Sequence, residues 1–291
     1  VLIAARFLQG LGSGACVVLA RSIIPDITSG VAAAKAFSWM GIISGIAPAA
    51  APVLGSLLVS SLGWRGIFYV LAGIAAAQLL VTLFVIPETR PPANRTPLSF
   101  RSFTAVIKEP VFVRYALVVG FGFASMFAYI SASSFVMQEI MGLSPQIFAL
   151  VFGTNALGLM VGGALNTRLL DRFPAAAILK IALIIMTVAA TIVLVCALTG
   201  LPRIPFFLAL FFAVMPLSLV MGNATALAVA AVRTRAGSAS SVMGFGQFLL
   251  AGLVSPLVGM VGGSQAVGMG VCMVGAAVVA VMMFVLARRA D

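Results

Sequence analysis

The chain has 291 residues, of which 63% are hydrophobic and 8% are charged, and its formal net charge is +11. An ordinary soluble domain has roughly 45–50% apolar and about 25% charged residues, so a soluble fold could not cover this chain's surface with polar side chains. The absence of histidine excludes nucleophilic sites with a histidine base and histidine-ligated zinc or haem. The composition therefore predicts an all-α protein embedded in a lipid bilayer.

Nine apolar stretches are long enough to cross a bilayer, which takes about 20 helical residues each. In chain order they cover residues 1–24, 36–62, 66–87, 111–138, 146–167, 175–199, 204–230, 238–262 and 266–287. Residues that interrupt helices separate several of them, at Pro25-Asp26, Leu62-Gly63, Leu143-Ser144-Pro145, Phe173-Pro174 and Leu201-Pro202. The sequence thus predicts nine transmembrane helices with short loops and no sizeable soluble domain.

Basic residues are distributed unequally between the two ends of these spans. Two of them, Arg65 and Arg203, lie on one side, and fourteen lie on the other: Arg21, Lys35, Arg90, Arg95, Arg101, Lys108, Arg114, Arg168, Arg172, Lys180, Arg233, Arg235, Arg288 and Arg289. Because cytoplasmic loops collect Lys and Arg, we expect the C-terminus in the cytoplasm and Val1 on the outer side. The charge lies in short loops beside membrane spans, so we expect no nucleic-acid partner.

A weak internal repeat indicates two halves. The sequence Ala-Pro-Val-Leu-Gly at 51–55 resembles Ser-Pro-Leu-Val-Gly at 255–259, an offset of 204 residues that would suit a six-helix half. The chain starts with Val, and no signal-peptide pattern precedes its first span. We therefore expect residues 1–87 to be helices 4–6 of an N-terminal bundle whose first three helices are missing. Residues 88–110 would form a cytoplasmic linker, and 111–291 a C-terminal bundle of helices 7–12.

Two motifs in the first two spans carry a resemblance to a known family. Arg-Phe-Leu-Gln-Gly-Leu-Gly at 6–12 resembles the fourth-helix motif of the major facilitator superfamily. The residues Gly41, Gly45, Pro48, Pro52 and Gly55 resemble the fifth-helix antiporter motif of its drug:proton antiporters. The doubled Ala-Pro at 47–48 and 51–52 is similar to the Bcr/CflA subfamily, named for bicyclomycin and chloramphenicol resistance, and so are the stretches 129–135 and 222–227.

This resemblance implies a major facilitator fold and a multidrug efflux transporter of the bacterial inner membrane. Such a transporter exports small amphipathic drugs in exchange for protons by alternating access, as a monomer, without enzyme activity, metal or cofactor, and with the proton gradient as its energy source. An exporter of a small metabolite, such as a sugar or amino-acid derivative, on the same fold is the alternative. We expect the 291-residue chain by itself to be inactive, because the coupling carboxylate would lie in the missing helices.

Arg6 lies inside the first predicted span and belongs to neither group of loop charges, and no acidic residue lies deep in any span. A guanidinium there costs from about 3 kcal/mol upward, so it should face a cavity or a partner. The resemblance implies that Arg6 takes part in proton coupling, with Gln9 one turn further along the helix. Alternatively, Arg6 lies near the outer interface and extends to water, and Gln9 forms a hydrogen bond between helices.

The Gly/Pro motif of the second span allows close helix packing and bends the helix. We expect Gly41, Gly45, Pro48, Pro52 and Gly55 to control leakage and the movement between the two bundles. Ordinary helix packing is the alternative, since Gly and Pro are common in membrane helices.

Six polar or amphipathic residues lie inside apolar spans, namely Tyr129, Ser131, Ser133, Asn155, Asn223 and Gln247. Binding sites near the midplane of transporters use such residues together with aromatic ones, here Phe121 and Phe245. We expect the set to line the substrate cavity. For any single member, a hydrogen bond between helices is the alternative.

Overall fold

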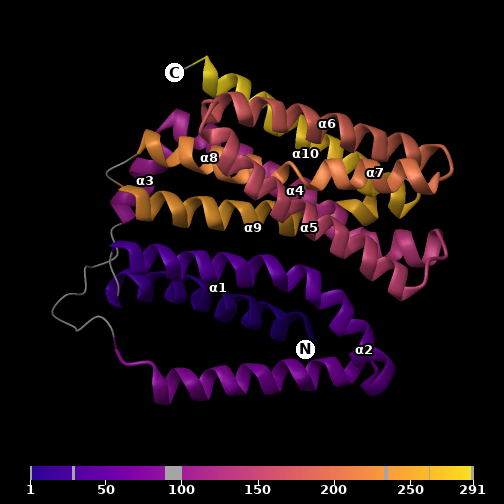
Figure 1. The fold of residues 1–291 in the computed structure, drawn as a ribbon, viewed down its shortest axis with the longest axis horizontal. Coiled ribbons are helices and arrows are strands. Elements are labelled where there is room, and N and C mark those ends of the chain that lie inside the picture. Colours follow the sequence, from indigo (N-terminus) through magenta and orange to yellow (C-terminus); the bar gives the residue numbers. More distant parts are fainter. Residues whose placement is uncertain (1, 28–29, 89–99, 233–234, 262, 290–291) are drawn as a thin grey trace. The chain divides into compact units, whose positions relative to one another are not determined.

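The computed structural model describes residues 2–27, 30–88, 100–232, 235–261 and 263–289, and in this part of the chain the regular secondary structure is helical (Figure 1). The chain divides into two compact units, Val1–Leu98 and Ser99–Asp291. Each unit has its own helices and is described by itself.

The first unit contains α1 (Leu2–Ile27) and α2 (Gly30–Val85), which pack against each other. Helix α2 consists of two arms joined at Gly63, whose φ of 66° and ψ of 176° glycine adopts at little cost. This is the interruption that Leu62-Gly63 predicts. The interruption predicted at Pro25-Asp26 is wrong, because α1 continues through both residues to Ile27.

The second unit begins with a short helix, α3 (Phe100–Ile107), inside the stretch predicted as a linker. Seven further elements follow: α4 (Pro110–Ser134) with its π-helical continuation η2 (Phe135–Ile140), α5 (Pro145–Leu170), α6 (Ala175–Leu198), α7 (Arg203–Val214), α8 (Leu217–Ala231), α9 (Ala236–Met260) and α10 (Gln265–Arg288). Helices α7 and α8 occupy the single span predicted at 204–230 and are separated at Pro216, which has no N–H to donate to the preceding turn.

The ends of these helices follow from local chemistry. The Ser144 Oγ accepts a hydrogen bond from the Ile147 N–H at 3.3 Å, and Pro145 occupies the first helical turn of α5. The Ser264 Oγ caps α10 in the same way, accepting from the Val267 N–H at 3.3 Å. Between α6 and α7 the chain reverses at Gly200 and Leu201, whose φ angles are 90° and 57°.

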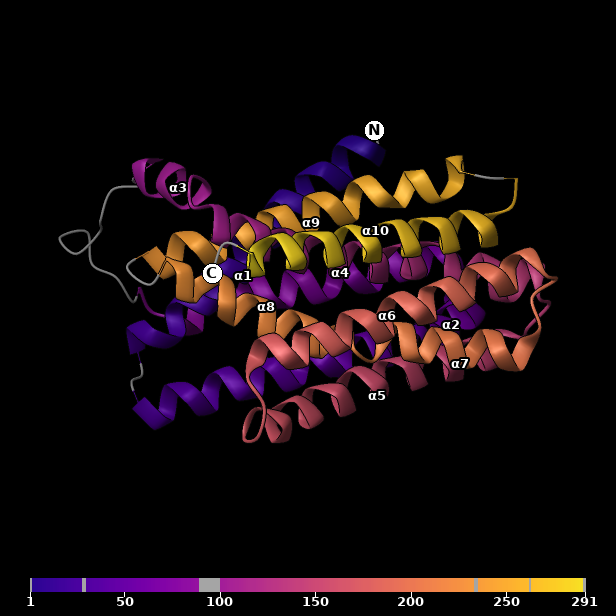
Figure 2. The same cartoon turned by 90° about the horizontal axis from the view of Figure 1, so that it is seen from above.

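Helix α4 lies at the centre of the second unit and packs against α8, α9 and α10. Helix α6 packs against α7, α8 and α10, and α5 packs against α7 and α8. Figure 2 shows α10 extending along α4 for most of its length. Gly270 of α10 permits the contact with α6, because a Cβ at this position would lie 2.8 Å from the Leu194 Cα.

Seven helical segments among the described residues are long and apolar enough to cross a membrane: Leu57–Val85, Pro110–Ile140, Pro145–Leu170, Ala175–Leu198, Arg203–Ala231, Ser238–Met260 and Gln265–Arg288. The described residues thus support seven spans rather than the nine expected. The expected spans 1–24 and 36–62 coincide with α1 and the first arm of α2, and many of their side chains lie outside the described residues.

Candidate functional site

Arg6 lies on α1 and has two neighbours in the first unit. Its Nη1 donates to the Gln9 Oε1 at 2.8 Å, and its guanidinium carbon lies 5.1 Å from the centre of the Phe68 ring. Phe68 belongs to the second arm of α2, so this contact links two helices. The sequence spacing placed Gln9 beside Arg6, whereas no local signal pointed to Phe68.

The side chain of Arg6 is a cation that donates hydrogen bonds and accepts none. It can hold a carboxylate in the ionised form by attraction. Asp26 and Glu88 are the acidic residues of the first unit's sequence, and Asp26 follows Arg6 by 20 helical residues, or about 30 Å. Arg6 therefore has no carboxylate near it along its own helix.

The predicted antiporter motif lies on the first arm of α2. The side-chain environments of Gly41, Gly45, Pro48 and Pro52 are outside the described residues, so their role stays a prediction. Gly55 is half-buried, and a Cβ built on it meets no atom within 4 Å.

Tyr129 of α4 and Asn155 of α5 form a buried contact between helices. The Asn155 Nδ2 donates to the Tyr129 Oη at 2.9 Å, and the two residues are 3% and 1% exposed. The Phe152 ring stacks on Tyr129 with centroids 5.7 Å apart. The polar atoms of this pair are thus directed at each other, as in the alternative of a hydrogen bond between helices.

Asn223 of α8 pairs with Asn166 of α5, a residue that the sequence analysis missed. The Asn223 Nδ2 lies 2.6 Å from the Asn166 Oδ1 and 2.8 Å from the Leu219 carbonyl oxygen in its own helix. Asn155 and Asn166 are eleven residues apart, which is about three helical turns and places both on one face of α5. That spacing is the signal that could have identified Asn166.

Two glycines between these asparagines bring α5 close to the junction of α7 and α8. A Cβ on Gly158 would lie 2.7 Å from the Phe211 ring, and one on Gly162 would lie 2.5 Å from the Met215 carbonyl oxygen and overlap the Ser218 Oγ. The face of α5 that carries Asn155, Gly158, Gly162 and Asn166 is therefore a tight packing surface.

The other predicted cavity residues are not joined to these pairs. The hydroxyls of Ser131 and Ser133 donate to carbonyls of their own helix, those of Ala128 and Ile130, at 3.1 and 3.2 Å. Gln247 is half-buried on α9. Of the two aromatic residues, Phe121 packs against the core, and Phe245 is 71% exposed. The structure thus brings together Tyr129 and Asn155, but not the set of six.

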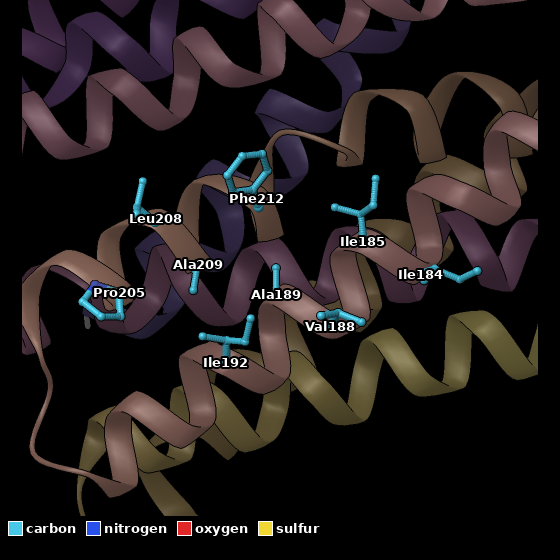
Figure 3. Close-up of a pocket in the computed structure, with 9 residues that line it drawn as sticks. All are labelled: Ile184, Ile185, Val188, Ala189, Ile192, Pro205, Leu208, Ala209 and Phe212. Atoms are coloured by element: carbon cyan, nitrogen blue, oxygen red, sulfur yellow. The ribbon is translucent and has the colours of Figure 1, made fainter.

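A pocket lies elsewhere in the second unit, between α6 and α7 (Figure 3). Its lining contains none of the predicted site residues. Within the described ranges there is also no group of three or more His, Cys, Asp or Glu residues that could hold a metal ion.

A chain whose described part holds seven apolar spans is a multi-pass membrane protein. Residues 1–256 match the Major Facilitator Superfamily, and the chain belongs to that superfamily. The resemblance seen in the sequence is confirmed at this level.

Several proteins are similar along much of the chain. The MFS-type transporter YdgK of Bacillus subtilis is 35% identical over 97% of this chain and 72% of its own length. The bicyclomycin resistance protein homolog of Haemophilus influenzae is 30% identical over 88% of this chain and 65% of that protein. The multidrug resistance protein MdtL of Escherichia coli is 31% identical over 54% of this chain and 40% of that protein. The chain thus spans about two thirds or less of the last two relatives.

One solved structure shows the fold. The bacterial homologue of the human lysosomal transporter Spinster, in an inward-facing and unoccupied conformation, matches with a TM-score of 0.65 at 20% identity. The match covers 93% of this chain and 74% of the other. Proteins of the superfamily are transporters of small molecules rather than enzymes, and they use ion gradients and no cofactor. The predictions of a non-enzyme without a cofactor are therefore confirmed.

Proposed function

We propose that the protein exports small amphipathic drugs across the bacterial inner membrane in exchange for protons. The observation that carries this proposal is the 30% identity to a bicyclomycin resistance protein homolog along 88% of the chain. The resemblance to multidrug resistance protein MdtL along 54% of the chain supports the same substrate class.

In this proposal Arg6 supplies the positive charge that attracts a proton-binding carboxylate, and this attraction couples proton binding to the movement of the bundles. The hydrogen bond that Arg6 donates to the Gln9 Oε1 and the ring of Phe68 hold the guanidinium in one orientation. A carboxylate that approaches it is stabilised in the ionised form, and protonation of that carboxylate removes the attraction. Proton binding thereby releases one contact. The two bundles, 1–87 and 111–291, joined by the linker 88–110, can then close the cavity on one side of the membrane and open it on the other. The residues Gly41, Gly45, Pro48, Pro52 and Gly55 limit leakage during that movement.

The polar residues of the second bundle shape the substrate cavity. In this proposal the bonded members Tyr129, Asn155 and Asn223 hold the helices that form its wall. The remaining three, Ser131, Ser133 and Gln247, contact the drug from α4 and α9. Aromatic and apolar contacts supply most of the affinity, as is usual for sites that accept many compounds.

Proton-coupled export is tested in inverted membrane vesicles that contain the native protein. A fluorescent indicator records the pH gradient, and addition of a transported drug should collapse part of it. Arg6→Ala should abolish this response. Arg6→Lys should weaken it, because an ammonium keeps the charge but loses the planar fork that binds Gln9.

Arg65→Ala is the matched control, since Arg65 lies in the same unit and its guanidinium also stacks on an aromatic ring, that of Trp64 at 4.2 Å. It should leave the response unchanged. If the native protein gave no drug-dependent collapse, proton-coupled export of those drugs would be wrong. Secretion of a sugar or amino-acid derivative without any drug response would indicate the metabolite exporter instead.

A further inference from the structure

The pocket between α6 and α7 is a groove with a floor of small residues and walls of large ones. Ala189 and Ala209 form the floor and are 4% and 5% exposed. The volume is about 490 Å³, and the walls are entirely apolar, formed by Ile184, Ile185, Val188, Ile192, Pro205, Leu208 and Phe212. Figure 3 shows the two alanines between the larger side chains of the two helices.

The dimensions of the groove suit a hydrocarbon chain. Both helices belong to segments that can cross a membrane. The lining of α6 extends from Ile184 to Ile192, eight residues or about 12 Å along the helix. The groove begins about 6 Å, or four helical residues, beyond Lys180 and is centred near the middle of α6, so the inner part of an acyl chain whose headgroup lies near Lys180 reaches it.

Positive charge collects at one end of the groove. Lys180 is exposed one helical turn before Ile184, and the exposed Arg168 and Arg172 lie in the last turn of α5 and the turn that leads to α6, where Asp171 is the only acidic residue. A lysine in this position extends its ammonium group toward the headgroups of the adjacent leaflet. The excess positive charge fits an anionic phosphate.

The other end of the groove has no comparable group directed toward it. Arg203 is the nearest cation in the sequence, and its Nη2 donates to the Met141 carbonyl oxygen at 3.3 Å, at the end of η2. Arg203 also lies two residues before the lining residue Pro205, which places it near the opposite face of α7. A headgroup is therefore favoured at the Lys180 end.

We propose that this groove binds one acyl chain of an anionic phospholipid, whose phosphate pairs with Lys180. A second copy of the chain is the competing occupant of such a surface. In a two-fold dimer about the membrane normal the same patch would meet itself, so the two Lys180 ends would face each other and repel. The site is separate from the residues of the proposed transport function and does not depend on it.

Native mass spectrometry of the whole protein tests the proposal. The protein is released from vesicles with equal amounts of phosphatidylglycerol and phosphatidylethanolamine, and we expect one retained phosphatidylglycerol per protein. Lys180→Gln should lower the preference for phosphatidylglycerol about fivefold, as expected for the loss of one cation beside a phosphate, and Lys180→Arg should restore it. Ala209→Phe, which fills the floor, should remove the retained lipid.

A second measurement applies even if Ala209→Phe fails to fold. Leu208 on the groove wall and Leu253 on α9 are 56% and 55% exposed, so Leu208→Trp and Leu253→Trp are a matched pair. Phosphatidylglycerol brominated in the middle of its acyl chain should quench the fluorescence of the tryptophan introduced by Leu208→Trp. The mole fraction of brominated lipid needed should be lower than for the tryptophan introduced by Leu253→Trp. Lys180→Gln should remove this difference.

Two results would overturn the proposal. One is equal quenching at both positions together with equal retention of the two lipids. The other is a dimer in the mass spectrum that carries no lipid and dissociates in the Ala209→Phe variant, which would identify a second copy as the occupant.

Discussion

Several buried polar side chains in the second unit form hydrogen bonds with partners on neighbouring helices. Tyr129 with Asn155 joins α4 to α5, and Asn223 with Asn166 joins α8 to α5. Ser125 of α4 donates to the Met273 carbonyl oxygen of α10 at 3.1 Å. Among the described residues, no buried side-chain nitrogen or oxygen lacks a hydrogen-bond partner. Since hydrocarbon offers no partner in exchange, these bonds position the helices as well as stabilise them.

The Tyr129–Asn155 bond should contribute measurably to stability. Tyr129→Phe removes the acceptor and leaves the Asn155 amide buried without a partner. We expect a loss of about 0.6–1.7 kcal/mol in the free energy of unfolding, which runs from the average to the maximum of double-mutant cycles on hydrogen bonds between membrane helices. Unfolding of the purified protein in detergent measures it.

A double-mutant cycle with Asn155→Leu isolates the contribution of the pair, because the coupling energy vanishes when the two residues do not interact. Ser131→Ala is the control, as its hydroxyl bonds only within α4. A coupling energy near zero would contradict the structure.

Gly162 should be intolerant of any side chain. Its Cβ would lie 2.5 Å from the Met215 carbonyl oxygen, a backbone atom that cannot move without α7 and α8. We expect Gly162→Ala to cost about 1–3 kcal/mol of unfolding free energy, as overpacking does. Gly163 is the adjacent control, because a Cβ there meets nothing within 4 Å. Gly163→Ala should be neutral or stabilising by up to about 1 kcal/mol. Equal effects at both positions would contradict the close approach.

The sequence identified most of the buried polar residues but not their partners. Polarity inside an apolar span marks Tyr129, Asn155 and Asn223 without any structure. Which helix each residue faces depends on the packing of α5 against α4 and α8, and no local pattern encodes that packing. Asn166 was missed because it lies near the end of its span, where polar residues are common and do not indicate a buried partner. Phe68 was missed because one aromatic residue among 21 Phe carries no signal.

At the scale of elements, hydropathy located the spans of the second unit but did not predict the irregularities within them. The six spans predicted after residue 110 coincide with helices of the second unit within a few residues. The π-helical end of α4 was not predicted, and there the Met141 N–H donates to the Val136 carbonyl oxygen at 3.0 Å. Hydropathy is also insensitive to the separation at Pro216, because residues on both sides of it are apolar.

The stretch predicted as a linker contains an element with a buried contact. Val106 of α3 is fully buried and belongs to the same core as Phe112 of α4 and Ala239 of α9. Ile107, the next residue, is 54% exposed. A short amphipathic helix of this kind is invisible to a search for spans, since one face of it is polar.

Helix α3 should detach when its buried contact is lost. Val106→Asp places a carboxylate in a site without water, which costs more than the roughly 2–7 kcal/mol of a buried neutral polar group. We expect trypsin to cleave after Lys108 at least about tenfold faster than in the parent protein in detergent. Ile107→Asp is the control and should leave the rate unchanged. Equal cleavage of both variants would show that α3 is not held by Val106.

At the scale of the whole molecule, the arrangement of charge and apolar surface defines how the protein lies in a bilayer. Helix α6 carries exposed Ile181, Val188 and Val195, which are 60%, 54% and 51% exposed. Such a stripe is stable against lipid and costly against water. The helix has 24 residues and a length of about 36 Å, enough to cross a hydrocarbon core of about 30 Å.

The two ends of α6 should therefore lie on opposite sides of the membrane, with the basic end in the cytoplasm. Arg168 and Arg172 precede its start and Lys180 lies in its second turn, whereas Arg203 is the basic residue that follows its end. In a variant whose three cysteines are replaced by alanine, a membrane-impermeant maleimide should label Thr199→Cys in intact cells and Asp171→Cys only in inverted vesicles. Both native residues are exposed, so access to the reagent is matched. Labelling of both from one side would mean that α6 does not cross the membrane, and the reverse pattern would place the C-terminus outside.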